Sequence, residues 1–179
     1  MECFVVALLN MAMTNEQNKI QAETRDWMID LAPNFTHAVT LTMKQSRTVM
    51  TDKGQTAQRL TVIEASANFA HFMKRLNAIV YGHAAKRHGK TVHVIPVIEG
   101  IATDKGLHYH CMMGNFREGA NDVLIAAAIR TAWLQTGFGN VQIDVRPMYS
   151  SDWCVYITKE VGKGDSDNVD YENVHPRKQ

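Results

Sequence analysis

Two histidines separated by a single residue, His108 and His110, lie in the apolar run from Gly106 to Met113. The run predicts a β-strand, and side chains at positions i and i+2 of a strand point to the same face of its sheet. The pair would therefore offer two imidazoles to one metal ion. Taken alone, a His-x-His pair is more often surface polarity or a satisfied core pair, so the prediction depends on what surrounds it.

A second pair, Tyr156 and Lys159, lies three residues apart in a short run, about 151–162, that we predict to be helical. A tyrosine hydroxyl is a poor nucleophile near its usual pKa of ~10. A phosphate polarised by a metal and a nearby positive charge would make its attack plausible, and Lys159 could supply that charge. On an amphipathic helix the same pair is usually a packed aromatic and a solvated lysine.

Apolar periodicity predicts the elements that must position these side chains. We predict strands over 35–43, 91–99, 107–113 and 141–145, and helices over 15–31, 60–88, 118–136 and 151–162. Gly89 would cap the second helix, Pro96 indicates an edge strand or bulge, and residues 44–58 would form a loop or small hairpin around Asp52-Lys53-Gly54. The order β-α-β-β-α-β predicts an α+β fold of the ferredoxin-like, split βαβ type. Its four-stranded antiparallel sheet would carry two helices on one face and leave the other free for an active site.

The phase of the 107–113 strand supports a site on that free face. Side chains alternate between the two faces of a strand. Tyr109 and the residues two and four positions away from it in this strand would face the helices, whereas His108 and His110 would face away from them. If the preceding hairpin pairs residue 99 with residue 108, Glu99 falls beside the imidazoles. Two histidines and a carboxylate suit a divalent ion with open positions, and imidazole nitrogens favour manganese over magnesium. Glu99 could equally be a solvated strand end.

Charge is distributed unevenly along the 179 residues, although the formal net charge is only +1. Residues 36–163 hold 15 Lys and Arg against 9 Asp and Glu, whereas residues 1–35 hold 2 against 5 and residues 164–179 hold 2 against 4. A moderately basic centre between acidic flanks permits a phosphate-containing partner without demanding one.

The remaining composition is that of an ordinary globular protein with enough length for one core. Cys3, Cys111 and Cys154 are odd in number and widely spaced, which favours reduced thiols and a cytoplasmic location. No apolar run reaches the ~20 residues of a membrane span, and we expect no membrane partner. The apolar run 3–13 lacks a basic start, so we expect no secretory signal, and Met11 or Met13 could be the true start.

Three short motifs in this order resemble those of the HUH endonucleases, in particular the rolling-circle replication initiator (Rep) proteins with one catalytic tyrosine. The first motif is the strand ending in Thr40-Leu41-Thr42, the second is His108-Tyr109-His110, and the third is Tyr156-x-x-Lys159. Each is weak alone, but their joint order makes the match fairly specific. The resemblance covers about residues 35–162 and implies an endonuclease domain there. Helical periodicity predicts an N-terminal helical extension within 1–34, and the polar, acidic composition predicts a poorly ordered tail over 163–179.

The resemblance implies a site-specific nickase and ligase acting on single-stranded DNA. Tyr156 would form a 5′-phosphotyrosine link and release a 3′-hydroxyl for a polymerase. His108 and His110, with Glu99 as the third ligand, would hold Mn²⁺ or Mg²⁺, and Lys159 would position or stabilise charge. The DNA would be the replication origin of a plasmid, phage or other mobile element. The chain has no room for a helicase domain, which implies a host helicase and polymerase as partners or an already single-stranded substrate.

Five side chains near the first and last strands are candidate DNA contacts. They are Thr40, Thr42, Lys44, Arg47 and Arg146. The chain departs from the family at Tyr109, which is bulkier than the usual aliphatic residue. Tyr149 would be a second tyrosine only if the last helix began earlier than we predict. The basic run from Lys86 to Lys90 is better explained as favourable charge at a helix C-terminus than as a DNA contact.

Two alternative functions stay open. A single-tyrosine transposase or a relaxase would use the same chemistry, although the Thr-Leu-Thr strand and the lysine after the tyrosine favour the replication type. A non-catalytic domain that binds single-stranded nucleic acid would use exposed aromatics on such a sheet, but the strand positions of the free face carry none. A plain metal-storage or structural domain would leave Tyr156 and Lys159 without a role.

Overall fold

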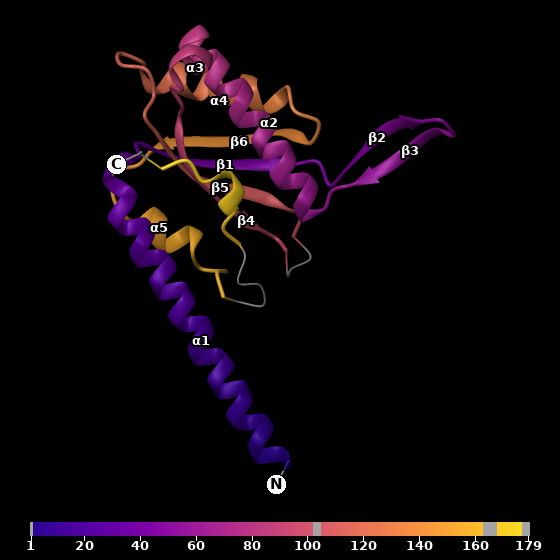
Figure 1. Ribbon diagram of the computed structural model, residues 1–179, viewed down its shortest axis with the longest axis vertical. Helices are drawn as coiled ribbons and strands as arrows, with labels where there is room; N and C mark the ends of the chain where they lie inside the picture. Colours follow the sequence, from indigo (N-terminus) through magenta and orange to yellow (C-terminus); the bar gives the residue numbers. More distant parts are fainter. Residues whose placement is uncertain (1, 102–104, 163–167, 177–179) are drawn as a thin grey trace.

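Four antiparallel strands form the central sheet in the order β4-β5-β1-β6 (Figure 1). They are β1 (His37–Met43), β4 (His93–Glu99), β5 (His108–Gly114) and β6 (Gly139–Pro147). The computed structural model describes residues 2–101, 105–162 and 168–176, with side chains from residue 15 onward. The α+β fold and its antiparallel sheet are confirmed, and the strand order is that of a split βαβ unit.

The helices α2 (Val62–Tyr81) and α4 (Asp122–Leu134) cover one face of the sheet. A capping box between Thr61 and Glu64 starts α2, and the Asn121 side chain accepts a hydrogen bond from the Leu124 amide at the start of α4. The core beneath them is built on interlocking aromatic rings, with Phe72 edge-on to Trp133 at 5.3 Å between centroids. The two helices and the core beneath them support the sheet on this face.

The single helix predicted over 60–88 is wrong, because the chain turns at Gly82. Gly82 has φ 55° and ψ −131°, a conformation that glycine alone adopts without strain, and it ends α2. A short helix α3 (His83–His88) follows, and Gly89 closes it in the left-handed conformation, as predicted. The apolar residues keep a helical period through both segments, so periodicity alone does not predict the break between them.

A two-stranded hairpin projects from the end of the sheet where β1 finishes (Figure 1). It consists of β2 (Ser46–Thr51) and β3 (Gly54–Arg59), and nearly all of its side chains are exposed. The hairpin alternative for residues 44–58 is therefore confirmed, with its turn at Asp52-Lys53.

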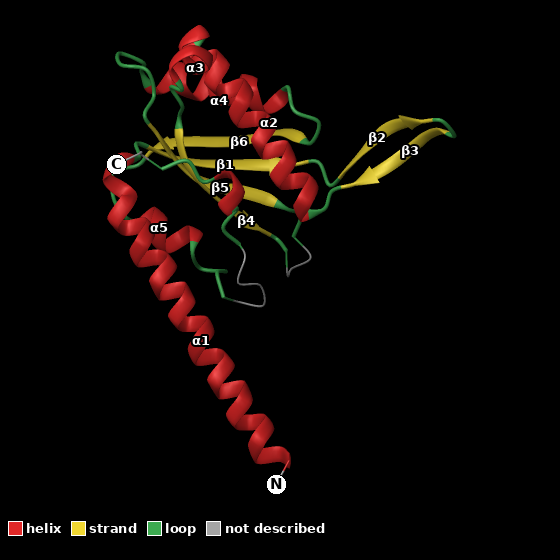
Figure 2. Cartoon of the chain, in the orientation of Figure 1, coloured by secondary structure: helices red, strands yellow, loops and turns green. Residues whose placement is uncertain are grey.

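The second face of the sheet is more covered than we predicted, since helices lie on both sides (Figure 2). The helix α1 (Glu2–Leu31), the 3₁₀ turn η1 (Ala32–Asn34) and the short helix α5 (Asp152–Ile157) approach this face. Met28, Met112, Cys154 and Ile157 form the centre of a second apolar cluster there. The N-terminal helix begins earlier than the predicted residue 15 and ends before Pro33, as predicted.

The prediction of a poorly ordered tail is wrong for residues 168–176, which return to the edge of β4. Val169 forms an isolated bridge with Val97, and His175 forms one with Val94. Between them, the 3₁₀ turn η2 (Tyr171–Asn173) places Asp170 and Asn173 in buried positions. Residues 163–167 and 177–179 of the predicted tail lie outside the described residues. Pro96 tolerates this edge position because it has no amide hydrogen to pair.

No helix in the described part of the chain combines the length and apolarity that crossing a membrane requires.

Candidate metal centre

Glu99, His108 and His110 converge at one end of the β4–β5 hairpin. Residue 99 pairs directly with residue 108 in the antiparallel register, as predicted, so the carboxylate lies beside both imidazoles. The Nε2 atoms of His108 and His110 lie 3.5 and 3.4 Å from the two Glu99 oxygens. One possible ligand atom from each residue lies within 4.8 Å of the other two, so this group could hold a metal ion.

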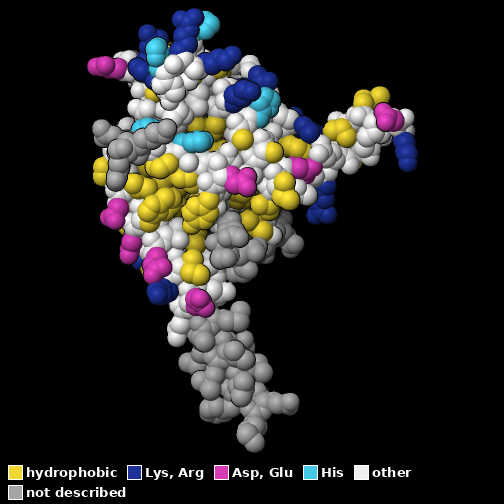
Figure 3. All heavy atoms as spheres, viewed as in Figure 1, with side chains coloured by type: hydrophobic (Ala, Val, Ile, Leu, Met, Phe, Trp, Pro, Cys, Tyr) yellow, Lys and Arg dark blue, Asp and Glu magenta, His cyan; other side chains and the backbone are white. Residues whose placement is uncertain are grey.

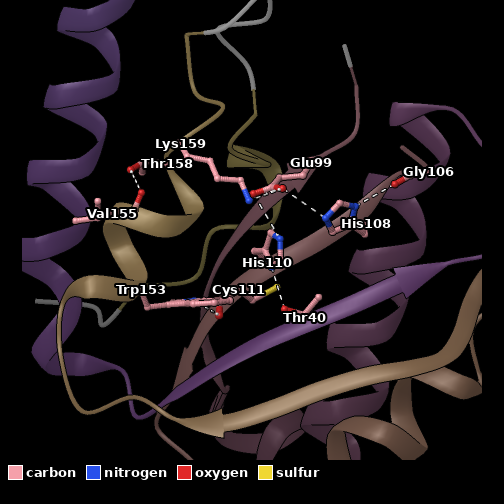
Figure 4. Close-up of polar contacts among 10 residues, drawn as sticks. All are labelled: Thr40, Glu99, Gly106, His108, His110, Cys111, Trp153, Val155, Thr158 and Lys159. Atoms are coloured by element: carbon pink, nitrogen blue, oxygen red, sulfur yellow. Dashed lines mark hydrogen bonds and ion pairs between the residues drawn. The ribbon is translucent and has the colours of Figure 1, made fainter. Parts of the chain in front are cut away.

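Each histidine ring is oriented by its other nitrogen (Figure 4). His108 Nδ1 lies 3.0 Å from the carbonyl oxygen of Gly106 and donates to it, which directs Nε2 toward Glu99. His110 Nδ1 lies 2.9 Å from the Thr40 hydroxyl oxygen. Metal-binding histidines are held in this way by a hydrogen bond on the nitrogen that does not bind the metal.

Two buried atoms at the centre of this group have no hydrogen-bond partner among the described residues. They are Glu99 Oε1 and His110 Nε2, which face each other at 3.4 Å in a geometry that makes no hydrogen bond. A buried polar atom without a partner is costly, and native structures rarely leave one. A divalent cation bound by these two atoms and by His108 Nε2 would remove both deficits, so the residues present fit a metal ion.

The electrostatics keep the Glu99 carboxyl ionised. Its side chain is only 2% exposed. Burial acts to raise the Glu99 pKa, but contacts with His108, His110 and Lys159 together lower it well below its usual range. The contact with Glu99 raises the pKa of His108, against the opposing effect of burial. A carboxylate held ionised in a buried place attracts cations.

Tyr156 stands over this group from α5. Its ring lies 5.2 Å from the His110 ring in an edge-on arrangement and stacks on Trp153 at 5.1 Å. Trp153 is itself anchored, because its Nε1 donates to the Cys111 carbonyl at 3.1 Å. The side chain of Tyr156 remains 46% exposed, so the nucleophile candidate is reachable from solvent.

Lys159 links the tyrosine to the carboxylate. Its Nζ lies 3.2 Å from Glu99 Oε2 and 3.8 Å from the centroid of the Tyr156 ring. Burial acts to lower the Lys159 pKa, but the contacts with Tyr156 and Glu99 outweigh it and raise the pKa above its ordinary value. The ammonium group therefore stays charged beside the phenol.

The predicted helix over 151–162 is too long, because α5 ends at Ile157 and Lys159 lies in the following turn. The Thr158 hydroxyl donates to the Cys154 carbonyl at 2.7 Å, and Gln21 of α1 donates to the Thr158 carbonyl at 2.8 Å. At Gly162, φ is +80° and an added Cβ would meet the Gln17 carbonyl oxygen at 2.6 Å. Thus α1 holds the turn that presents Lys159 to Glu99.

A cavity of about 470 Å³ opens over the group. Its lining includes the predicted residues Thr40, Thr42, Glu99, His108, His110, Tyr156 and Lys159. The structure thus brings together every predicted metal, nucleophile and charge-stabilising residue. Thr42 lies at its edge, where its hydroxyl donates to the Gln142 carbonyl at 2.6 Å.

The three predicted basic DNA contacts do not line this cavity. Arg47 lies on the hairpin, where it stacks on Phe138 at 4.5 Å and donates to the Gln58 side chain. Arg146 is paired with Asp144 at 2.8 Å on β6. Lys44 is exposed just after β1. None of them faces the tyrosine directly, so any role with DNA lies beyond the cavity.

Sequence reasoning missed two contributors to the site. Trp153 stacks on the Tyr156 ring, and its position three residues before the tyrosine on one helix is the signal that could have indicated this contact. Gln45 was passed over, although its amide donates to the Leu107 carbonyl and accepts from the Leu107 amide. No local sequence pattern predicts these hydrogen bonds between Gln45 and Leu107.

Comparisons with protein-family models, with curated proteins and with solved structures each found no match.

Proposed function

We propose that this protein is a metal-dependent, single-tyrosine nickase for single-stranded DNA, of the HUH endonuclease type, that initiates rolling-circle replication of a mobile element. One observation carries the proposal: the buried Glu99–His108–His110 group shares a cavity with Tyr156, and Lys159 contacts both the carboxylate and the tyrosine. If Tyr156 were only a packed aromatic residue and Lys159 only a solvated lysine, the two would have no reason to lie together beside three residues that could bind one metal ion.

Glu99, His108 and His110 would hold Mn²⁺ or Mg²⁺. When bound, the ion supplies a Lewis acid that polarises a phosphodiester oxygen. Two imidazole nitrogens favour Mn²⁺ over Mg²⁺, which prefers oxygen ligands. Metal binding requires an ionised Glu99, which its contacts maintain, and a deprotonated His108 Nε2, which would lose its proton when the ion binds.

Tyr156 would attack the scissile phosphorus, forming a bond from its phenolic oxygen to the 5′-phosphate and breaking the bond to the 3′-oxygen. The phenol loses one proton and the released 3′-hydroxyl gains one, so the step needs no oxidant and consumes no proton overall. Lys159, held protonated beside the ring, would stabilise the phenolate as it forms. The stacked Trp153 and the edge-on His110 ring limit where the phenol can point.

The Thr40-Leu41-Thr42 strand and the lysine after the tyrosine favour a replication initiator over a single-tyrosine transposase or a relaxase. Within this strand, Thr40 supports the candidate metal group directly, because its hydroxyl orients the His110 ring.

A covalent-adduct assay tests the proposal. The protein would be mixed with labelled single-stranded circular DNA, and with a random oligonucleotide pool, in the presence of Mn²⁺. Denaturing gels should show a protein–DNA adduct that disappears in Tyr156→Phe and in His108→Ala and persists in Tyr149→Phe, the matched control. The absence of an adduct on both substrates would reject the nickase.

One observation favours a second candidate, a non-catalytic domain that binds single-stranded nucleic acid. The strands carry no exposed aromatics, but on α5 the Trp153 ring stacks on Tyr156, which lines the cavity and is a ring on which a base could stack. Such a domain would bind the oligonucleotide pool equally well in wild type, Tyr156→Phe and His108→Ala, and would form no adduct.

A further inference from the structure

The segment 65–98 carries an unusual concentration of one sign of charge. It contains five lysines and arginines, four histidines and no carboxylate. The fold gathers much of this charge at one end of the molecule, on α2, on α3 and in the connection to β4. Figure 3 shows Lys, Arg and His side chains crowded at the end that carries α3.

This end lies away from the metal centre. The strand β4 begins beside the basic segment at His93 and finishes in the metal centre at Glu99. The two regions are therefore at opposite ends of the sheet, and no residue that lines the metal-centre cavity lines the cavities of the basic end.

Two adjoining cavities run across the basic end. The first, of about 660 Å³, is lined by Lys74, Lys86, Lys90 and His83 among others. The second, of about 820 Å³, shares Lys90 and adds Arg117. The shared lysine joins them into one elongated surface, which we call the basic track and define by Lys74, Lys86, Lys90 and Arg117.

No carboxylate in the described part of the chain offsets the charge of the basic track. All four side chains are exposed, and none forms an ion pair with a carboxylate of the described residues. Glu118 is the one acidic residue among those that line the two cavities. Like charges held close together repel one another and destabilise the folded state. An anionic partner would relieve that repulsion.

Favourable charge at a helix C-terminus does not explain the basic track. That effect acts within the last turn of a helix, and α3 has only six residues, of which Lys86 is the one member of the track in its last turn. Lys74 lies inside α2, Lys90 follows the capping Gly89, and Arg117 lies in the loop after β5. Three of the four cations therefore need another explanation.

We propose that the basic track binds the phosphate backbone of duplex DNA, separately from the metal centre. Its length across two cavities suits a linear polyanion better than a single anion. Tyr81 and Phe116 are half-buried, and the imidazole of His83 is the one exposed ring among the described residues that line the two cavities, so the track offers little ring surface on which unpaired bases could stack. The choice of DNA among polyanions rests on the proposed function, because a nickase acts beside duplex DNA.

The test is the salt dependence of binding to a duplex of random sequence, measured by fluorescence anisotropy in EDTA. Each lost phosphate contact lowers the slope of log K against log salt by about 0.9. Lys86→Gln with Lys90→Gln should therefore make the slope shallower by about 2 and weaken binding at low salt. The matched control, Lys19→Gln with Arg25→Gln on α1, removes the same charge and should keep the wild-type slope. Equal slopes in the two double variants would overturn the proposal.

Two further arms complete the test. Polyaspartate of matched charge should compete poorly with the duplex, and tighter binding of polyaspartate would instead assign the basic track to an acidic protein. Adduct formation on a short single-stranded oligonucleotide should proceed in Lys86→Gln/Lys90→Gln as in wild type. Loss of the adduct in this variant would show that the basic track acts in the nicking reaction and would reject a separate binding site. Because the anisotropy experiment needs no metal and no cleavage, a failed nickase proposal and a failed duplex site give different results.

Discussion

Glu99 and Lys159 form an ion pair of 3.2 Å between the end of β4 and the turn after α5. The same ammonium lies over the Tyr156 ring, so one lysine contacts a metal-ligand candidate and the nucleophile candidate together. In the absence of a cation, Lys159 neutralises part of the buried charge of Glu99. Binding of a metal ion would weaken that hold and leave the ammonium free to act on the phenol.

Lys159→Gln should separate metal binding from chemistry. Loss of the ammonium removes a competing cation, so Mn²⁺ affinity measured by calorimetry should stay the same or increase. Adduct formation should slow by about 10²-fold, the usual cost of losing a group that stabilises a developing oxyanion. Lys159→Arg keeps the charge and should lose less activity. Wild-type adduct rates in Lys159→Gln would show that the lysine has no part in the reaction.

Metal binding should stabilise the fold through the two unpartnered buried atoms. At Mn²⁺ concentrations a hundredfold above Kd, a site present only in the folded state adds about 2.7 kcal/mol. We expect the Tm of the wild type to rise with Mn²⁺ and fall back with EDTA. The Tm of His110→Ala should not respond, because that variant lacks one of the two atoms. An equal Mn²⁺ response in both proteins would place the ion elsewhere.

The unusual tyrosine between the two histidines should matter for stability. Tyr109 is fully buried, and its hydroxyl donates to Asp170 Oδ2 at 2.8 Å. Asp170 also accepts from Ser66 and Asn173, so Tyr109 ties β5 to the C-terminal segment. Tyr109→Phe should cost about 1 kcal/mol in urea unfolding.

The matched control is Tyr171→Phe, since the Tyr171 ring is 59% exposed. It should change stability by less than about 0.5 kcal/mol. Equal losses in the two variants would mean that the Tyr109–Asp170 hydrogen bond adds nothing to stability.

The two buried cysteines should be inert in the native protein. Burial raises the pKa of Cys111 well above its usual value and also raises that of Cys154. The thiolate is the reactive form, so both should resist iodoacetamide at neutral pH. In a Cys3→Ser background, mass spectrometry should find both labelled only after denaturation. Stoichiometric labelling of native Cys154 would indicate that α5 opens from the sheet.

The sequence was sufficient to predict where the candidate metal ligands lie. Strand alternation fixed the face of His108 and His110, and the hairpin register put Glu99 beside them, because both features repeat every two residues. These are local relationships, and the structure confirms the geometry they predicted.

The parts that were missed depend on contacts distant in sequence. The turn after α5 contacts Gln17 and Gln21 of α1, and a periodic pattern over 151–162 contains no information on these contacts. The polar C-terminal segment resembled a solvated tail. It is ordered over 168–176 because Asp170 finds buried partners on β5 and α2.

The most direct test of the central claim is to identify the residue that carries DNA. The protein would be trapped with an oligonucleotide substrate and Mn²⁺, digested with nuclease and trypsin, and sequenced by tandem mass spectrometry. We predict a 5′-linked nucleotide on Tyr156, with no such adduct when Mn²⁺ is replaced by EDTA. A nucleotide on Tyr149 or another residue, or none on Tyr156 under conditions where nicking occurs, would contradict the account.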